Sequence, residues 1–198
     1  MKARLILFPF LLCALGFCSS YAQNSQWQRG FNLAHSPVKD SVWGKPVKFY
    51  ISNKKCSPLA IAFYYGTFRP TDNDSTEKLL ALITTSDTSL RPFYRWVLSK
   101  TIQIQDGALG EYTGIPARRY AEVFPIEFFT YMDSDKTGNR YKAWVDAISY
   151  SGYYQVENTN QKNKNTLRQN MIANCINCNR STIKNIEKFV GDCFNYSE

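Results

Sequence analysis

The spacing of apolar residues along this chain is mainly that of helices. In one segment Leu90, Phe93 and Val97 recur at intervals of three and four, which places them on one face of a helix. Similar apolar stripes run through two later segments, and each stripe needs a partner surface to cover it. The helices predicted in this way are residues 90–104, 139–149 and 181–193.

Capping residues mark two helix starts. The segment Asp74-Ser75-Thr76-Glu77 has the capping-box pattern, in which Asp74 accepts from a backbone N–H three residues on and Glu77 reaches back. This pattern predicts a helix over about 75–85. Ser89 is the expected N-cap of the next helix, with Pro92 in the first turn, where a missing N–H is harmless.

Prolines divide the middle of the chain. Residues 116–123 and residues 125–132 each begin with proline, which is favoured at the first position of a helix. We therefore expect two short helices that are broken at Phe124-Pro125.

Residues 44–68 have a mixed pattern. Val47, Phe49 and Ile51 alternate as in a strand, whereas Pro46 and Ser57-Pro58 resemble helix starts. We favour helix in this region, with a small β element near 44–68 as the alternative.

Composition and polarity complete the prediction of the fold. The Asn- and Lys-rich stretch at about 155–165 has almost no apolar residue and is expected to be a flexible polar loop. A hydrophobic content of 44% and an aromatic content of 15% argue against disorder. The sequence therefore predicts a mainly α fold, with residues 23–198 forming a single compact domain of short packed helices stabilised by disulfides.

The first 22 residues have the pattern of a secretory signal peptide. Lys2 and Arg4 precede an apolar run from Leu5 to Phe17, and Ser20-Tyr21-Ala22 supplies small residues before a cleavage site at Gln23. The apolar run is too short to span a bilayer, so no transmembrane segment is expected. The alternative of a lipid anchor at Cys18 is disfavoured because Phe17 precedes it. We expect an exported, soluble protein of the periplasm or the extracellular space.

The charge of the chain limits the classes of partner. Removal of Lys2 and Arg4 with the signal lowers the net charge from +8 to +6. The basic residues are scattered and form no dense run of the kind that follows a phosphate backbone. Nucleic acid is therefore not expected, whereas an anionic envelope polymer or an acidic protein is compatible with this charge.

The mature chain contains four cysteines, Cys56, Cys175, Cys178 and Cys193. An even number in an oxidising compartment predicts a framework of two disulfides without free thiols. If residues 181–193 are helical, Cys193 lies too far from Cys178 to form a bridge. We therefore expect Cys193 to pair with Cys56, or with Cys175 if the intervening chain doubles back.

Two functional interpretations of Cys175-Ile176-Asn177-Cys178, a redox motif and a zinc site, are less favoured. A redox motif needs its thiol at the start of a helix that follows a strand, and this segment follows a predicted helix. A zinc site would add Cys193 with Cys56 or His35, but the second ligand pair lacks the usual spacing. No cofactor and no metal are expected.

The segment from Asp133 to Gly138 resembles the first half of a calcium-binding loop, with oxygen ligands at positions 1, 3 and 5. The second half fails because position 12 is Trp144 where a bidentate Glu is required. We favour a structural turn in which Asp133 or Asp135 caps the following helix.

Candidates for catalysis are few. His35 is the only histidine, and it lies in a segment without helical or strand pattern. A pair of carboxylates could hydrolyse a glycan, and the central acids are Asp106, Glu111, Glu122 and Glu127, near Tyr112 and Tyr120. Since solvated acids are far commoner than catalytic ones, we assign no catalytic residue and favour a protein that is not an enzyme.

A run of tyrosines is the preferred binding site. Glycine inside Tyr150-Ser151-Gly152-Tyr153-Tyr154 suggests a turn that displays its rings, and tyrosine combines apolar area with a polar tip. Tyr150, Tyr153 and Tyr154 are therefore the expected binding residues. The function predicted is a non-catalytic binding or interaction protein of the cell envelope, including inhibitor or immunity types, with a protein or envelope glycan as partner. A carboxylate-dependent glycan hydrolase is the alternative.

Overall fold

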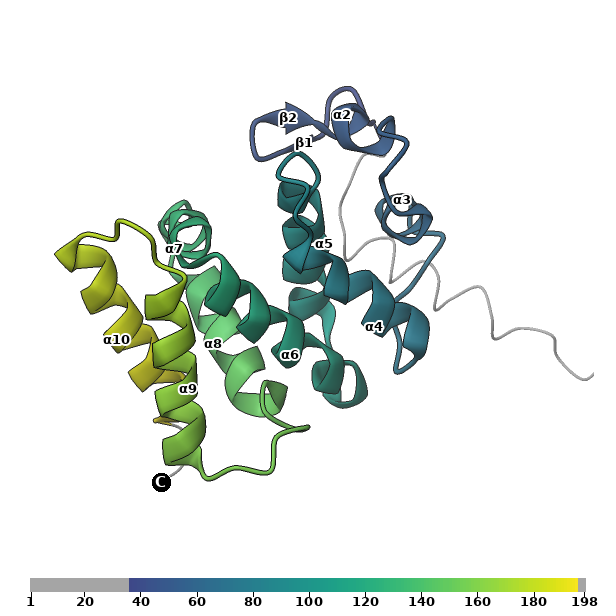
Figure 1. Cartoon of the computed structure of the whole chain (residues 1–198). Coiled ribbons are helices and arrows are strands. Elements are labelled where there is room, and N and C mark those ends of the chain that lie inside the picture. The colour runs from purple at the N-terminus through teal and green to yellow at the C-terminus, as the bar shows by residue number, and fades with distance from the viewer. Residues whose placement is uncertain (1–35, 196–198) are drawn as a thin grey trace, which may run out of the picture.

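Helix α5 (Arg91–Ile104) is the central element of the computed structural model, which describes residues 36–195 (Figure 1). The predicted signal peptide and His35 lie outside this range. Helix α5 packs on β1, α3, α4, η1, α6 and α8, because its apolar stripe and the opposite side of the helix are both buried. Figure 1 shows the N-terminal hairpin and α2 at the top, α3 and α4 on the right, and α9 and α10 on the left.

The remaining elements follow in chain order. Strands β1 (Ser41–Val42) and β2 (Lys45–Pro46) form an antiparallel hairpin that pairs Val42 with Lys45. The helices before and around α5 are α2 (Val47–Ile51), α3 (Pro58–Tyr64), α4 (Asp74–Ala81), the 3₁₀ helix η1 (Leu82–Thr84) and α6 (Gly107–Val123). The last four are α7 (Pro125–Asp133), α8 (Asn139–Ser151), α9 (Asn160–Ala173) and α10 (Arg180–Phe194).

The mainly α fold predicted from the sequence is confirmed. The helices expected over 90–104, 139–149 and 181–193 are α5, α8 and α10, and the region 44–68 contains α2 and α3. The small β element is the hairpin at 41–46, which begins before that region. Its two-residue turn, Trp43-Gly44, has positive φ at both residues.

The capping residues differ from those expected. Asn73 is the N-cap of α4 and accepts from the backbone N–H of Thr76 at 3.0 Å, which leaves Asp74 in the first turn. Asp87, not Ser89, accepts the backbone N–H of Leu90 before α5. In both cases a neighbouring Asx side chain has the better reach to the free backbone donors.

Two boundaries expected from the sequence are wrong. Pro116 does not begin a helix but lies inside α6, which starts nine residues earlier behind its N-cap Asp106. The polar loop expected at 155–165 ends earlier than predicted, because Thr159 caps α9 by accepting from Lys162 N at 3.3 Å. The buried face of α9 begins with Asn163, whose polar side chain interrupts the apolar pattern that Leu167 and Met171 continue.

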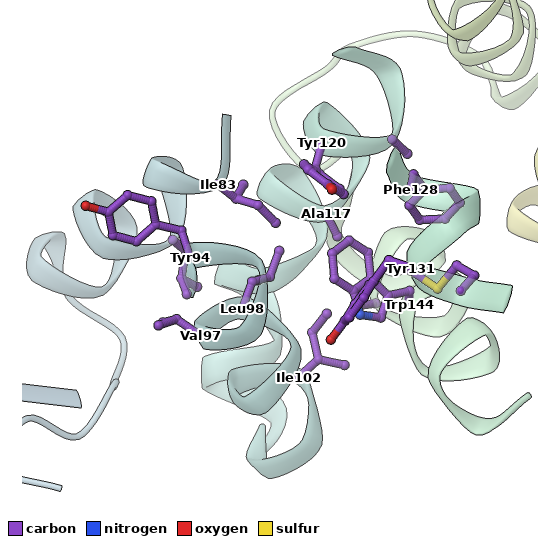
Figure 2. Close-up of a cluster of buried hydrophobic side chains, with 14 of the residues drawn as sticks. Ile83, Tyr94, Val97, Leu98, Ile102, Ala117, Tyr120, Phe128, Tyr131 and Trp144 are labelled. Atoms are coloured by element: carbon purple, nitrogen blue, oxygen red, sulfur yellow. The ribbon is translucent and has the colours of Figure 1, made fainter. Parts of the chain in front are cut away.

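Aromatic rings fill the centre of the core. Trp144 of α8 is fully buried, and the ring centroids of Tyr120, Phe128 and Tyr131 lie 5.8–6.1 Å from it (Figure 2). Phe128 also contacts Phe189 of α10 at 4.7 Å. These contacts connect α6, α7, α8 and α10 and account for the fully buried apolar stripe of each helix.

Helices α6 and α8 cross in backbone contact. A Cβ atom at Gly114 would lie 2.4 Å from the carbonyl oxygen of Ala147 and from the backbone nitrogen of Gly152. Ser151 joins the two helices, since its hydroxyl donates to the carbonyl of Gly110 at 2.6 Å and accepts from the N–H of Gly114 at 3.0 Å. Gly110 and Gly114, four residues apart on α6, therefore set the distance between α6 and α8.

The cysteines form one bridge among the described residues. Cys175 is bonded to Cys178 in the turn between α9 and α10, and Cys56 and Cys193 are buried free thiols. The expected bridge from Cys193 to Cys56 or Cys175 is absent from these residues. The reason is the packing of the helices: Cys56 precedes α3 and contacts Tyr94 of α5, whereas Cys193 lies on α10, which packs on α8 and α9.

Replacement of Gly114 by Ala should destabilise the protein because the added methyl group has backbone atoms on two sides. We expect the free energy of unfolding to fall by about 1–3 kcal/mol, as is typical of overpacking. Gly191→Ala in α10 is the matched control, since its Cβ would meet no atom closer than 4.0 Å. That change should stabilise by about 0.5–1 kcal/mol. If thermal melts gave equal stabilities for the two variants, the backbone contact between α6 and α8 at Gly114 would be contradicted.

Thiol titration tests the arrangement of the cysteines. Burial raises the pKa of Cys56 to about 11, against the weaker opposing effect of its hydrogen bond with Tyr94, and burial also raises the pKa of Cys193. Both thiols should therefore be unreactive near pH 8 in the native protein and react after denaturation. A count of two thiols per denatured mature chain is expected. A count of zero would restore the two-disulfide framework.

Candidate functional site

The tyrosine run begins in the last turn of α8 and divides into exposed and packed rings. Tyr150 and Tyr154 are 47% and 56% exposed, and their ring centroids lie 5.7 Å apart. Tyr153 instead lies on the guanidinium of Arg118 at 4.8 Å and against Phe194 at 5.3 Å. Two of the three tyrosines that the sequence singles out are therefore displayed, Tyr150 from the end of α8 and Tyr154 from the turn after it, while the third packs on α6 and α10.

Tyr154 borders a groove between α4, η1 and α6. The groove encloses about 290 Å³, close to the lower end of the roughly 300–1,000 Å³ range of small-molecule sites. Ile83, Ile115 and Pro116 supply its apolar surface. Pro116, which interrupts the backbone hydrogen bonding of α6, thus forms part of the groove wall.

Charged side chains border this groove without partners. Glu77 projects from α4, and Glu111 and Arg119 project from α6. None of the three makes a side-chain hydrogen bond or ion pair with any residue from 36 to 195. All three are exposed. Their hydrogen-bonding capacity is therefore directed to solvent or to a ligand.

Two tyrosines also line the groove, together with the polar side chains of Thr84 and Gln155. Tyr112 of α6 and Tyr154 face the groove from different elements. The pKa of Tyr154 is raised by its hydrogen bond with Tyr150, by partial desolvation and by the negative charges of Tyr150 and Glu111. The last effect shows that the Glu111 carboxylate and the Tyr154 hydroxyl are electrostatic neighbours.

The other acids considered for catalysis have structural roles. Asp106 caps α6 by accepting from Leu109 N at 3.0 Å. Glu122 pairs with Arg118 at 3.1 Å, and Glu127 pairs with Arg91 at 2.8 Å. Among the four predicted candidates, only Glu111 faces the groove.

Glu77 is the groove acid that the sequence did not indicate. It lies in the segment that the sequence assigned to a capping box, and the cap is made by Asn73 instead. Only the packing of α4 against α6 brings Glu77 and Glu111 to the same groove. No local pattern could have indicated this, because the two residues lie on different helices.

Two other hollows lie beside the turn before α8, with volumes of about 420 and 650 Å³. Most of the polar side chains that line them have partners within the protein, with Asp133 an exception among residues 36–195. Tyr141 donates to Asp192 at 2.6 Å, and Arg140 donates to the hydroxyl oxygen of Ser134 at 2.7 Å. The α4–α6 groove differs because its charged residues have no such partners among the described residues.

Asp135 holds the turn that the sequence compared with a calcium loop. Its carboxylate accepts from the N–H of Arg140 at 2.8 Å and from the N–H and hydroxyl of Thr137 at 3.0 and 2.7 Å. Gly138 has a φ of 73°, as the turn requires. No group of three or more potential metal ligands occurs within residues 36–195.

The Cys175–Cys178 bridge lies beyond the end of α9, and Cys178 precedes Asn179, the N-cap of α10. Cys175 is buried, whereas the intervening Ile176 is 75% exposed. The bridge closes a turn of positive φ at Asn177, so its evident role is to fix the connection between α9 and α10.

Comparisons with known proteins give no relative. No protein-family model, no curated protein and no solved structure matches this chain. Within the described residues, no helix has both the length and the apolar character needed to cross a bilayer. The structure is thus that of a mainly helical protein with a small groove lined by polar, aromatic and aliphatic side chains.

The pH dependence of the melting temperature should reveal how much the Asp135 carboxylate stabilises its turn. Hydrogen bonds from Arg140 N, the Thr137 hydroxyl and Thr137 N lower the pKa of Asp135 to about 2 from an ordinary 3.8. A lowered pKa stabilises the fold above the ordinary value, and this stabilisation is lost as pH falls from about 4 towards 2. Melting temperatures of wild type and Asp135→Asn should differ near neutral pH and converge over this interval.

Asp133→Asn is the matched control for that comparison. No described residue donates a hydrogen bond to the Asp133 side chain, so this variant should melt like the wild type near neutral pH. A pH-independent difference between wild type and Asp135→Asn would contradict the role assigned to the Asp135 carboxylate.

Proposed function

We propose that this protein is exported and acts as a non-catalytic binding protein of the cell envelope, with the α4–α6 groove as its ligand site. The observation that carries the proposal is the meeting, in one groove, of two tyrosines with three charged side chains that have no partner among residues 36–195. The signal-peptide pattern of residues 1–22 and the net positive charge support an envelope location.

The groove suits a polar segment that carries both hydrogen-bond donors and an acidic group. Glu77 and Glu111 would accept hydrogen bonds from hydroxyl or ammonium groups, and Arg119 would donate to a carboxylate. Tyr154 offers an exposed ring face for a sugar ring or an aliphatic side chain. These properties are shared by envelope glycans that bear peptides and by surface segments of proteins.

A glycan hydrolase is the second candidate. The observation that favours it is the presence of Glu77 and Glu111 on the same groove. Hydrolysis by paired carboxylates requires an acid that keeps its proton in a desolvated setting. Both glutamates are exposed, and for this reason we place binding before hydrolysis.

Affinity capture with matched variants tests the proposed function. The mature protein, expected to begin at Gln23, would be immobilised and incubated separately with envelope proteins and with purified envelope glycan. Retention of one of these is expected, with Tyr154→Ala weakening binding by at least about 30-fold if the ring is an anchor. Glu111→Gln should weaken binding as well, because a charged hydrogen-bond acceptor is lost.

Variants outside the groove serve as controls. Tyr65→Ala removes another exposed tyrosine, and Glu187→Gln removes an acid of an exposed ion pair with Arg168, which contributes little to stability. Both should bind like the wild type. Equal binding by the groove variants and these controls would reject the groove. Release of soluble fragments from glycan, abolished by Glu77→Gln or Glu111→Gln, would establish the hydrolase instead.

A further inference from the structure

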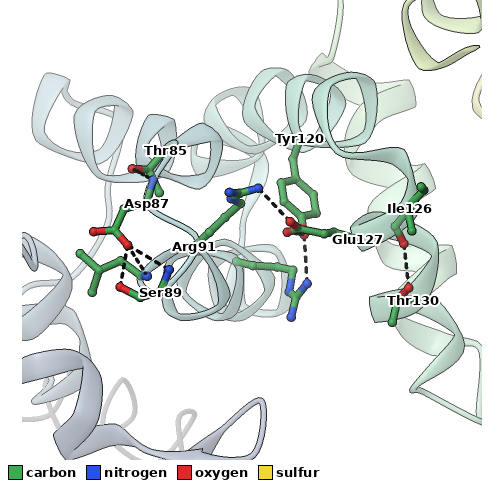
Figure 3. Close-up of polar contacts among 10 residues, drawn as sticks. Thr85, Asp87, Ser89, Arg91, Tyr120, Ile126, Glu127 and Thr130 are labelled. Atoms are coloured by element: carbon green, nitrogen blue, oxygen red, sulfur yellow. Dashed lines mark hydrogen bonds and ion pairs between the residues drawn. The ribbon is translucent and has the colours of Figure 1, made fainter. Parts of the chain in front are cut away.

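Two arginines are buried beside a single carboxylate, away from the groove residues. Arg91 and Arg95 lie four residues apart on α5 and are 4% and 3% exposed. Arg91 donates to Glu127 at 2.8 Å, and Arg95 donates through Nη1 to the hydroxyl of Tyr120 at 3.0 Å. Figure 3 shows Arg91, Tyr120 and Glu127 converging from α5, α6 and α7. The cluster therefore holds two guanidinium groups and one negative charge.

Tyr120 does not supply a second negative charge. Burial raises its pKa to about 12, although the positive charge of Arg95 acts in the opposite direction. The neutral hydroxyl accepts from Arg95 and donates to the Glu127 carboxylate at 3.4 Å. One buried positive charge consequently remains without an anion among the described residues.

The unbalanced charge is that of Arg95. Its Nε and Nη2 atoms are buried and have no hydrogen-bond acceptor within residues 36–195. These two atoms form one edge of the guanidinium plane, the edge that presents parallel N–H groups to a carboxylate or phosphate. Burial of such an edge without an acceptor is costly, and native structures rarely tolerate it.

Aromatic rings cover Arg95 without satisfying that edge. Its Cζ atom lies 4.4 Å from the centroid of the Trp43 ring and 4.2 Å from that of Tyr131. A ring face attracts the positive charge, but it offers no lone pair to the in-plane N–H groups of the guanidinium. The two rings therefore stabilise the cation and leave the Nε and Nη2 donors unused.

Trp43 is the exposed part of this cover. It lies at the tip of the β1–β2 hairpin, is 45% exposed and has a φ of 51°, a value that a bulky residue rarely adopts. The residue before it is held in place, because the hydroxyl of the buried Tyr50 donates to Val42 O at 2.8 Å. The Trp43 ring also makes an edge contact with Tyr131 at 5.9 Å, so a group that reaches Arg95 from this side must displace the Trp43 ring.

We propose that Arg95 is an oxyanion-binding site, in which a carboxylate or phosphate group takes both N–H donors of the Nε–Nη2 edge when Trp43 moves aside. The bound group supplies the second negative charge of the cluster. The hairpin tip acts as its lid, and the free Nε of Arg91 adds a further buried donor in the same cluster. This site is independent of the α4–α6 groove.

Thermal melts of the full mature protein test the site. Sodium phosphate and sodium acetate would be titrated separately against sodium chloride at constant ionic strength, which identifies the oxyanion that binds. We expect a saturable rise in melting temperature with at least one of them, of roughly 5–10 °C at about 100 times the Kd. Arg95→Met should abolish the rise and should still fold, because Tyr120 keeps Glu127 as its partner.

Two further variants locate the anion. Binding should change the tryptophan fluorescence of the wild type but not that of Trp43→Phe, which should keep the rise in melting temperature. Arg119→Met, in the groove, should also keep the rise. No rise relative to chloride, or a rise that survives Arg95→Met, would overturn the proposal. Loss of the rise in Arg119→Met would place the anion in the groove instead.

Discussion

Helices α6 and α8 touch backbone to backbone at Gly114, where even one methyl group would lie 2.4 Å from the carbonyl oxygen of Ala147. The groove depends on this contact. Glu111 and Ile115 directly follow the two glycines of the crossing, and Tyr154 follows the end of α8 that the crossing holds in place. The hydrogen bonds of Ser151 to Gly110 and Gly114 fix the register of the two helices. The groove residues of α6 therefore keep a constant position relative to Tyr154.

Charge is used in two different ways in this molecule. In the groove, Glu77, Glu111 and Arg119 are exposed and unpartnered among the described residues, which costs little because water solvates them until a ligand arrives. In the α5 cluster, Arg91 and Arg95 are desolvated, and their cations depend on Glu127 and on aromatic rings. Exposed charges can exchange partners at little cost, whereas each buried donor without an acceptor raises the free energy of the folded state.

The packing of the helices determines which aromatic side chains are buried and which are exposed. Trp144 is fully buried at the centre of the core, while Trp43 is 45% exposed on a hairpin tip. Adjacent Tyr153 and Tyr154 likewise separate, the first packing on Arg118 and the second bordering the groove. A cluster of aromatic residues in the sequence therefore did not distinguish packing from display, because that distinction depends on which neighbouring helix lies within reach.

The helical class, the apolar stripes of α5, α8 and α10, and the break at Phe124-Pro125 can be predicted from the amino-acid sequence, because they follow from local spacing and backbone restrictions. The position of Pro116 inside α6, the place of Asn163 on a buried helix face and the separation of Cys56 from Cys193 follow instead from how the helices pack. The same packing forms the groove that brings Glu77 and Glu111 together. Such features depend on contacts between distant helices, whose free energy outweighs local preference and leaves no periodic signal along the chain.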